Sequence, residues 1–477
     1  MSIRLFNTLT RSTDTLTPLH DKEIRMYTCG PTVYNNVHIG NWRAYIFADL
    51  LKRYLKYRGY GVTHVMNVTD VDDKTIKGAH ESGTTLKEYT DHYTNLFLHG
   101  LEELRIERPD TLPRVSDHIE DIITFIQKLL DRGYAYKSDG SVYFRIKKSP
   151  KYGALALLDA QELKPNASER NNRDEYEKEN ISDFALWKAW QESDGDMYWE
   201  SSFGKGRPGW HIECSVLSTK YLGEQFDIHT GGVDLIFPHH TNEIAQTEAI
   251  TEKKFVSIWL HNAHLVIDGK KMSKSLRNFF TLEDVRSMGI HPIIMRFLLI
   301  RTHFQHEIDF SRTLADEARQ IFIKYATLFC ELESDRSGDG WSGIDTALFT
   351  AEKEFTEALD DNLNISNALR ALFELGTTIN ANLAKLTIEE KRKVMDRYRK
   401  FDTVTSVFIP AYEIYKKARM EKENDPKIRK LAEERQKARA AKDYATADNV
   451  RNELLAQGVA IRDIGDTGYA LDVIDWI

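Results

Sequence analysis

Cysteine is scarce in this chain, with three among 477 residues. So few cysteines exclude a disulfide-framed secreted scaffold and favour a reducing compartment. Long apolar runs are also missing: the longest, near residues 292–300, carries Arg296 and is far too short to cross a bilayer. The N-terminus has no apolar signal region. We therefore expect a cytoplasmic protein without a membrane partner.

Positive charge is in short supply as well, because 65 Lys and Arg stand against 73 Asp and Glu, a formal net charge of −8. This balance argues against a protein that coats DNA non-specifically, and we expect no DNA partner. Residues 416–442 are the exception: eleven Lys and Arg against five acidic residues give a local net charge of +6. This segment is either an RNA-binding face or only a solvated helix.

What is present suits a large globular protein. Hydrophobic residues make up 41% of the chain and aromatic residues 11%, which suits roughly two to four domains. Residues 24–29 predict a buried strand, residues 44–55 a helix and residues 62–68 a second strand. Strand, helix and strand in this order form a βαβ unit of a parallel sheet, and ligands bind such sheets beyond the carboxyl ends of the strands.

The later segments differ in pattern. Residues 85–135 have a helical pattern, whereas residues 140–205 are polar and irregular, and we interpret the latter as an insertion between two halves of the sheet. Strands and helices alternate again over residues 210–300. The chain becomes helical from about residue 312, and Pro410 and Pro426 predict a joint before a last module.

Four residues with metal-ligating side chains lie scattered over the α/β part. Cys29 ends the first strand, Cys214 follows a Gly-Trp-His turn, and His239 and Glu243 are four apart in a predicted helix that opens at Pro238. That spacing puts both side chains on one helix face. Thiolate, imidazole and carboxylate donors suit zinc better than magnesium or calcium. Taken singly, any one of these residues is better explained as structural, since a lone buried cysteine is usually a small core residue.

Two short motifs indicate nucleotide chemistry. His38-Ile39-Gly40-Asn41 precedes a helix, whose first N–H groups suit a phosphate, and His38 can donate to it. Lys271-Met272-Ser273-Lys274-Ser275 follows a Gly turn, and its two lysines suit a departing pyrophosphate. The two motifs in this order, about 230 residues apart, are far more specific than either alone.

This ordered pair resembles the two signatures of class I aminoacyl-tRNA synthetases, which activate an amino acid with ATP and pass it to tRNA. Asn41 departs from the His usual at the fourth position of the first signature. Segments 27–34, 67–74, 206–215 and 226–243 resemble the cysteinyl-tRNA synthetase family, and the resemblance runs from about residue 3 to the C-terminus.

The resemblance implies a class I Rossmann-like, parallel-sheet α/β catalytic domain with an insertion, followed by a helical bundle and a small C-terminal anticodon-binding module. We predict these parts at residues 1–115 (first half of the catalytic domain), 116–205 (insertion), 206–311 (second half and signature loop), 312–410 (helical bundle) and 411–477 (anticodon-binding module).

The resemblance also assigns site residues. One zinc ion per chain is expected on Cys29, Cys214, His239 and Glu243, with His240 as an alternative to His239. The ATP-binding residues are His38, Gly40, Asn41, Lys271, Ser273 and Lys274, of which His38, Lys271 and Lys274 are catalytic. The substrate-binding residues are Thr69, Trp210, His229 and Asp234. Trp210 and His229 would close on the substrate and Asp234 would hold its α-amino group, although Trp210 alone also suits a core position.

The expected reaction joins L-cysteine to tRNA(Cys) through cysteinyl-adenylate, with Mg²⁺ accompanying ATP. Zinc would select the substrate thiolate, because an ordinary pocket separates cysteine poorly from serine. An alternative is a related ligase that passes cysteinyl-adenylate to an amino sugar amine. That enzyme needs no anticodon module, so the basic segment beyond residue 416 argues against it.

Overall fold

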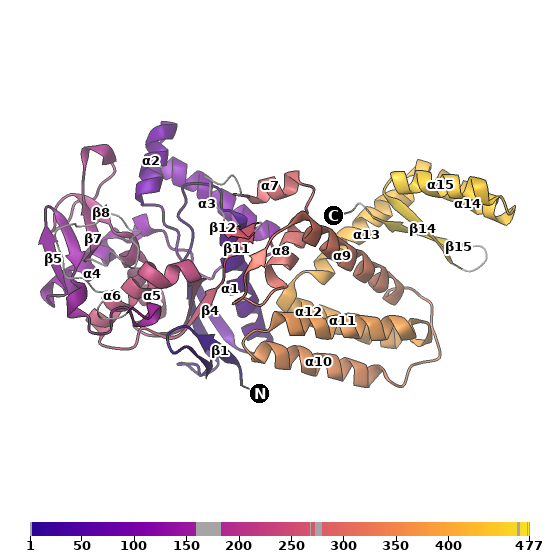
Figure 1. Cartoon of the computed structure of the whole chain (residues 1–477), viewed down its shortest axis with the longest axis horizontal. Coiled ribbons are helices and arrows are strands. Elements are labelled where there is room, and N and C mark those ends of the chain that lie inside the picture. The colour runs from indigo at the N-terminus through magenta and orange to yellow at the C-terminus, as the bar shows by residue number, and fades with distance from the viewer. Residues whose placement is uncertain are drawn as a thin grey trace. The chain divides into compact units, whose positions relative to one another are not determined.

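The computed structural model describes residues 2–158, 183–267, 269–271, 279–464, 468–474 and 476 (Figure 1). The chain forms two compact units. Unit 1 comprises Met1–Leu282, Thr302–Asp309 and Ala358–Asn364, and unit 2 comprises Glu283–Arg301, Phe310–Glu357 and Ile365–Ile477.

A four-stranded parallel sheet forms the centre of unit 1, with strand order β10-β9-β3-β4. Its strands are β3 (Glu23–Thr28), β4 (Gly61–Met66), β9 (Phe226–Gly232) and β10 (Val256–Asn262). Helix α1 (Ile39–Tyr57) connects β3 to β4, which is the predicted βαβ unit. The carboxyl ends of β3 and β9 lie side by side, because Thr28 pairs with Thr230. Residues that follow these strands therefore meet at one edge of the sheet.

The insertion contains more regular structure than its polar sequence predicts. Strands β5 (Ala135–Ser138), β6 (Ser141–Phe144), β7 (Phe184–Ala189) and β8 (Gly206–Pro208) form an antiparallel sheet in that order. The irregular interpretation of residues 140–205 is therefore wrong for β6 and β7. Both strands are buried and belong to the same apolar core as α4 (Ile119–Asp131) and α5 (Trp210–Leu222). The apolar runs of these two strands are short and lie between polar segments, so the strand pattern is hard to recognise in the sequence.

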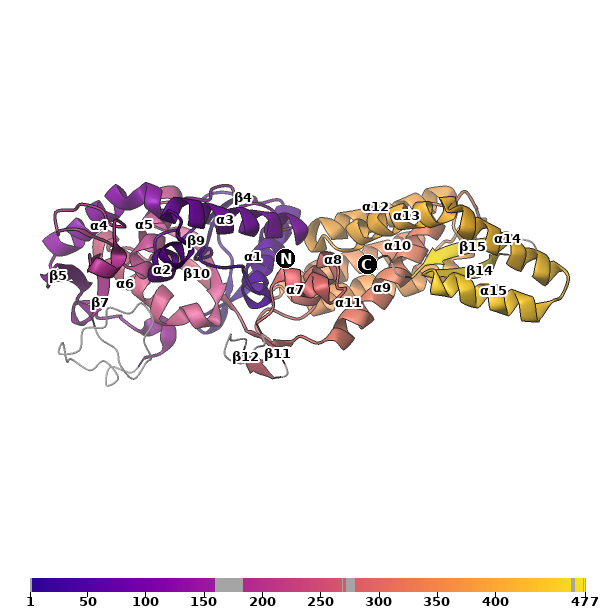
Figure 2. The same ribbon diagram turned by 90° about the horizontal axis from the view of Figure 1, so that it is seen from above.

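The predicted helical stretch 85–135 is interrupted. Helix α3 (Leu86–Glu103) ends before an extended segment, in which Thr111 pairs with Val65 and Arg114 with Val68, and α4 follows. The remaining elements of unit 1 are β1 (Arg4–Asn7), β2 (Ser12–Thr15), α2 (Asp73–Ser82), α6 (Thr241–Thr251), β11 (Leu265–Ile267), β12 (Lys270–Lys271) and β13 (Ile308–Asp309). Strands β11 and β12 form an antiparallel pair (Figure 2).

Unit 2 is mainly helical. Its helices are α7 (Leu282–Ser287), α8 (Pro292–Ile300), α9 (Arg312–Leu332), α10 (Ile344–Asp360), α11 (Ile365–Asn382), α12 (Ile388–Thr405) and α13 (Phe408–Asn424). The first residue of α7 and the last three of α10 are counted in unit 1. Aromatic rings from α9, α12 and α13 pack together: Tyr325 contacts both Tyr398 and Phe408. Helix α9 begins close to the predicted start of the helical region.

The C-terminal module has a small core of its own. Helices α14 (Pro426–Ala440) and α15 (Tyr444–Ala456) pack on the hairpin of β14 (Val459–Ile464) and β15 (Gly468–Val473). The predicted boundary after residue 410 lies inside α13, whose Phe408, Tyr412 and Tyr415 are buried. Cutting the chain there would therefore remove part of the bundle core.

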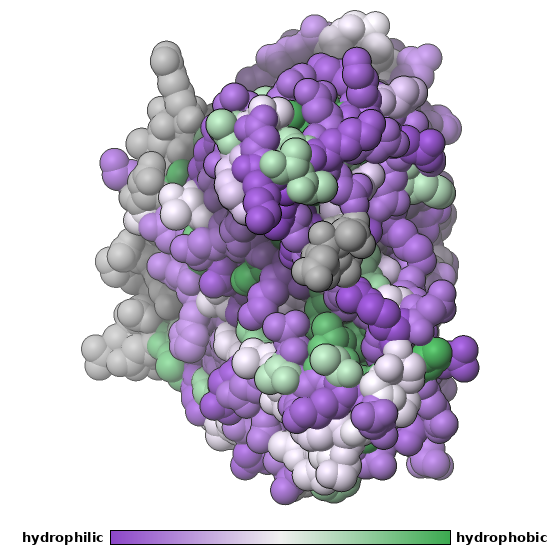
Figure 3. Space-filling model, turned by 90° about the vertical axis from the view of Figure 1, so that its right-hand side faces the viewer, coloured by the Kyte–Doolittle hydropathy of each residue, from purple (hydrophilic) through white to green (hydrophobic). Residues whose placement is uncertain are grey.

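The described helices do not include one that combines the length and apolarity needed to cross a bilayer. The face of the molecule in Figure 3 is mainly hydrophilic, with scattered apolar areas. Isolated apolar residues of this kind are ordinary on protein surfaces.

Candidate metal centre and active site

The four predicted metal ligands meet at the carboxyl edge of the parallel sheet. Cys29 directly follows β3, Cys214 lies in the first turns of α5, and His239 and Glu243 flank the start of α6. One ligand atom from each lies within 4.8 Å of the others. Cys214, His239 and Glu243 are buried, and Cys29 is partly buried. Helix α6 begins at Thr241, three residues after the predicted Pro238. His239 and Glu243 nevertheless face each other, with Nε2 and Oε1 3.2 Å apart.

The distances suit a tetrahedral ion. Two sulfur atoms bound to zinc at about 2.3 Å with a tetrahedral angle lie about 3.8 Å apart. The Sγ atoms of Cys29 and Cys214 are 3.8 Å apart. Glu243 Oε1 lies 3.7 Å from Cys29 Sγ. These separations are close to those that one tetrahedral ion requires, and the remaining donor atoms lie within 4.8 Å of one another.

Neighbouring imidazoles orient two of the donors. His211 Nδ1 lies 2.9 Å from His239 Nδ1, so His239 presents Nε2 to the cluster. That Nε2 atom forms no hydrogen bond with the described residues. His229 Nε2 lies 3.0 Å from Glu243 Oε2, which leaves Oε1 facing the sulfur atoms. Partners that hold the far side of a ligand in this way are typical of metal sites.

Burial sets the protonation of the cluster. It raises the pKa of the Cys29 and Cys214 thiols, and it lowers the pKa of His239 to about 3. The imidazole is therefore neutral and has a lone pair to donate. Both thiols keep their protons until a cation supplies compensating charge, and a bound zinc ion deprotonates such thiols. The donor chemistry thus fits zinc.

His240 belongs to a second possible ligand set, with Cys29, His229 and Glu243. Its Nε2 atom lies 3.3 Å from Cys29 Sγ, and its Nδ1 atom lies 2.7 Å from His261 Nε2. This set lacks Cys214. Moreover, His239 lines the cavity beside the cluster, whereas His240 does not. A substrate in that cavity would reach the set that contains His239.

The cavity has a volume of about 330 Å³ and joins the cluster to the nucleotide motif. Among the predicted site residues it is lined by Cys29, Cys214, His239, Trp210, Asp234, His38, Gly40 and Asn41. The ring of Trp210 packs 4.3 Å from that of His239. Two predicted substrate residues do not line it: Thr69 and His229 are buried behind the wall. Instead, the Thr69 hydroxyl donates a hydrogen bond to the Glu213 carboxylate, and His229 Nε2 forms a hydrogen bond with the Glu243 carboxylate.

The first nucleotide motif differs in detail from expectation. His38 is the N-cap of α1, and its Nδ1 atom accepts hydrogen bonds from the N–H groups of Gly40 and Asn41, at 3.1 and 3.3 Å. These two N–H groups, predicted to face phosphate, are thus already bound. Because Nδ1 accepts, the ring hydrogen lies on Nε2. We therefore expect the imidazole of His38, and not these two backbone N–H groups, to be the part of the turn that faces a phosphate.

The second motif lies mostly outside the described residues. The backbone of Lys271 pairs with Val266 in β12, but its side chain, Ser273 and Lys274 are not described. Phe279, shortly after them, packs against the ring of His38 at 4.8 Å. The chain that follows the second motif therefore returns to the first.

Sequence reasoning missed Asn67, which lines the cavity and accepts a hydrogen bond from the N–H of Gly30. It follows β4, at the edge where ligands of parallel sheets bind, and this position was the available signal. His211 was also missed, although it lies between Trp210 and Cys214. The third cysteine, Cys330, is half-buried on α9 in unit 2.

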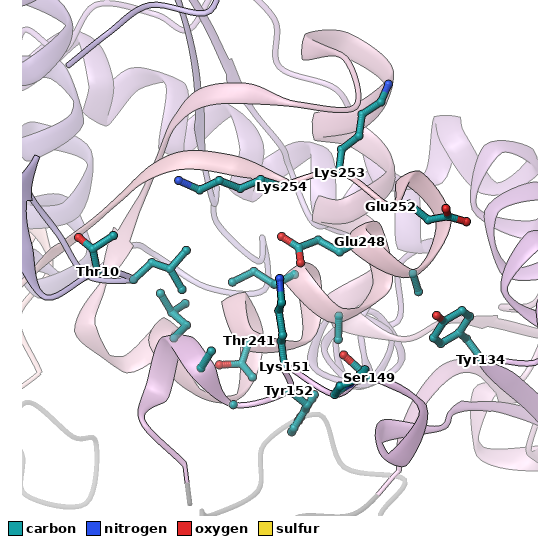
Figure 4. A pocket seen from close by; sticks show the side chains of 18 residues that line it. Thr10, Tyr134, Ser149, Lys151, Tyr152, Thr241, Glu248, Glu252, Lys253 and Lys254 are labelled. Carbon is teal, nitrogen blue, oxygen red and sulfur yellow. The ribbon is translucent and has the colours of Figure 1, made fainter. Parts of the chain in front are cut away.

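A larger cavity of about 590 Å³ opens against other residues of α6 (Figure 4). Lys151 and Glu248 face its interior, and Lys253 and Lys254 stand at its margin. None of the predicted site residues lines it. Size alone therefore does not identify the active site.

Comparison with known proteins agrees with this geometry. Residues 15–320 match the family model of the tRNA synthetases class I (C) catalytic domain, residues 354–408 the DALR domain, and residues 423–469 the cysteinyl-tRNA ligase anticodon binding domain. The structure resembles Mycobacterium tuberculosis methionyl-tRNA synthetase in complex with methionyl-adenylate, with a TM-score of 0.57, 14% identity and coverage of 82% of this chain and 89% of that one. The fold is thus that of a class I aminoacyl-tRNA synthetase, as predicted.

Relatives in sequence define the family within this class of synthetases. The chain is 44% identical to cysteine–tRNA ligase of Brachyspira hyodysenteriae over 97% of both chains. It is 42% identical to that of Protochlamydia amoebophila over 97% of this chain and 96% of the relative. The chain belongs to the cysteine–tRNA ligase family.

Proposed function

We propose that this protein joins L-cysteine to tRNA(Cys): it forms cysteinyl-adenylate and pyrophosphate from cysteine and ATP, and then transfers the cysteine to the tRNA. One observation carries the proposal. The Cys29–Cys214–His239–Glu243 cluster and the His38 turn open into the same cavity, so a thiol ligand and a nucleotide can meet there. The anticodon-domain match over residues 423–469 favours tRNA over an amino sugar as acceptor.

Cys29, Cys214, His239 and Glu243 would hold one zinc ion, which supplies a Lewis acid that binds a thiolate far better than a neutral hydroxyl. The remaining cavity residues would orient the substrate. Trp210 covers the His239 side, where it excludes water from the thiolate. Asp234 is the cavity carboxylate that can hold the α-ammonium group. Gly232 leaves room for the Asp234 carboxylate, since a Cβ at position 232 would lie 2.4 Å from Asp234 Oδ1.

The phosphates of ATP would lie at the N-terminus of α1. His38 donates from Nε2 to the α-phosphate region as charge develops there, and its Nδ1 bonds to Gly40 and Asn41 fix the ring. Lys271, Ser273 and Lys274 are proposed to stabilise the departing pyrophosphate. Mg²⁺ would enter with ATP, since it binds phosphates in preference to dedicated protein cages. The cytoplasm suits the protein, because its three cysteines are free thiols.

The test is cysteine-dependent ATP–pyrophosphate exchange, measured together with zinc content and tRNA charging. We expect exchange with cysteine and almost none with serine, about one zinc per chain, and charging of tRNA(Cys) only. Exchange that is equal for serine and cysteine would contradict the role of the metal. Exchange without charging of tRNA would contradict the second half of the reaction.

A further inference from the structure

The two cysteines of the cluster are 185 residues apart, yet side-chain hydrogen bonds connect the segments that contain them. Cys29 is followed by Gly30, whose N–H donates to Asn67 Oδ1 at 2.8 Å. Cys214 is preceded by Glu213, whose Oε2 accepts from the Thr69 hydroxyl at 2.7 Å. Asn67 Nδ2 donates to Thr69 Oγ1 at 3.0 Å and completes the chain. A continuous set of hydrogen bonds thus runs from one cysteine segment to the other.

Thr69 is the centre of this set, because all of its polar groups take part. Its N–H donates to Pro31 O at 3.0 Å, and its carbonyl accepts from the Val33 N–H at 3.1 Å. Its hydroxyl donates to Glu213 and accepts from Asn67. The residue is buried and does not line the cavity, so its hydroxyl has no access to a substrate.

The packing around these bonds is tight. A Cβ at Gly30 would lie 1.7 Å from the Asn67 carbonyl oxygen, so the Cys29 segment lies directly against the end of β4. Asn67 Oδ1 is also 3.7 Å from Cys214 Sγ. A shift of this set would therefore move both sulfur atoms relative to each other.

We propose that Thr69 is a positioning residue. With Asn67 and Glu213 it forms a brace that holds the Cys29 and Cys214 sulfur atoms 3.8 Å apart, the distance between two sulfur ligands of one tetrahedral zinc ion. This inference rests on the proposed metal site. It replaces the direct substrate contact expected of Thr69 from the sequence. Outer partners of metal ligands typically change metal affinity about 10- to 100-fold when removed.

The experiment compares Thr69→Val with Thr69→Ser in the full chain. Valine keeps the shape and removes the hydroxyl, whereas serine keeps the hydroxyl. We expect the zinc dissociation constant, measured by chelator competition, to rise about 10- to 100-fold for Thr69→Val and to stay within about 3-fold for Thr69→Ser. The KM for cysteine should rise in Thr69→Val while the KM for ATP stays unchanged.

Thr90→Val is the matched control. Thr90 is also buried, but its hydroxyl donates to Leu86 O within α3, so zinc affinity should not change. If Thr69→Val does not fold, Glu213→Gln tests the other end of the brace, because it weakens the charge-assisted bond without changing the shape. It should weaken zinc binding at least about 3-fold.

The outcomes separate the two proposals. A zinc-loaded wild type whose affinity is unchanged in Thr69→Val, or in Glu213→Gln where that variant stands in, would overturn the brace and leave the metal site in place. A wild type without tightly bound zinc would overturn both. Equal losses in Thr69→Val and Thr69→Ser would also overturn the brace, because the serine hydroxyl restores its bonds.

Discussion

Which of the two adjacent histidines holds the metal can be decided with a matched pair of variants, His239→Asn and His240→Asn. The asparagine amide lies near the position of imidazole Nδ1 but cannot reach that of Nε2. His239→Asn therefore keeps a polar group beside His211 and removes the donor that lies 3.2 Å from Glu243 Oε1. His240→Asn likewise keeps a polar group beside His261 and removes the Nε2 atom near Cys29.

The expected magnitude follows from the number of donors. Zinc binding by four protein ligands is worth about 10–16 kcal/mol, or about 2.5–4 kcal/mol for each ligand if shared evenly. His239→Asn should therefore weaken zinc binding about 10²- to 10³-fold. His240→Asn leaves the set of Cys29, Cys214, His239 and Glu243 complete. It should change the affinity less than about 10-fold, through the packing around Cys29 alone.

The measurement is zinc content by elemental analysis after dialysis against a chelator, followed by cysteine-dependent ATP–pyrophosphate exchange. We expect His239→Asn to lose zinc and exchange together, and His240→Asn to keep about one zinc per chain. Thermal unfolding of the chelator-treated proteins serves as the control for folding. Zinc loss in His240→Asn with retention in His239→Asn would refute the assignment and favour the set of Cys29, His229, His240 and Glu243.

Four further outcomes are expected. Lys274→Ala should slow adenylate formation about 10²-fold or more, the scale of one lost transition-state donor, and leave the dissociation constant for cysteine unchanged; a normal exchange rate with weak cysteine binding would contradict its placement at pyrophosphate. A chain that ends at Asn424 keeps α13 and should retain exchange but lose tRNA charging; unchanged charging would make the basic segment only a solvated helix. Burial lowers the pKa of His64 to about 3, so in mildly acidic solution the unfolded chain binds a proton that the folded chain does not. Because of this residue the free energy of unfolding should fall by about 2 kcal/mol between pH 7 and pH 5. In denaturant titrations His64→Gln, which removes the ring, should lose less unfolding free energy over this pH range than the wild type. Serine should support almost no exchange, and seryl-tRNA should persist with the enzyme; rapid enzyme-dependent deacylation would reveal an editing site.

Local patterns in the sequence predicted much of unit 1. Strands β3 and β4 correspond to short apolar runs, and helix α1 corresponds to the segment between them whose apolar residues recur with a period of 3.6. These patterns can be recognised because each element forms from residues close in sequence. The four-residue spacing of His239 and Glu243 likewise predicted their shared face, although α6 begins later than expected. The two nucleotide motifs predicted the synthetase class, and the resemblance of segments 27–34, 67–74, 206–215 and 226–243 predicted the family.

Tertiary structure alone decided what those residues form together. No spacing rule brings Cys29 within 3.8 Å of Cys214, 185 residues away; the packing of α5 against β3 and β4 does so. The same packing buried Thr69 and His229 behind the cavity and placed Phe279 against the ring of His38. It also formed the antiparallel sheet of the insertion from short, non-adjacent strands. Sequence thus determined which chemical groups are available, and long-range packing determined which of them face the substrate, because burial and orientation depend on residues far apart in the chain.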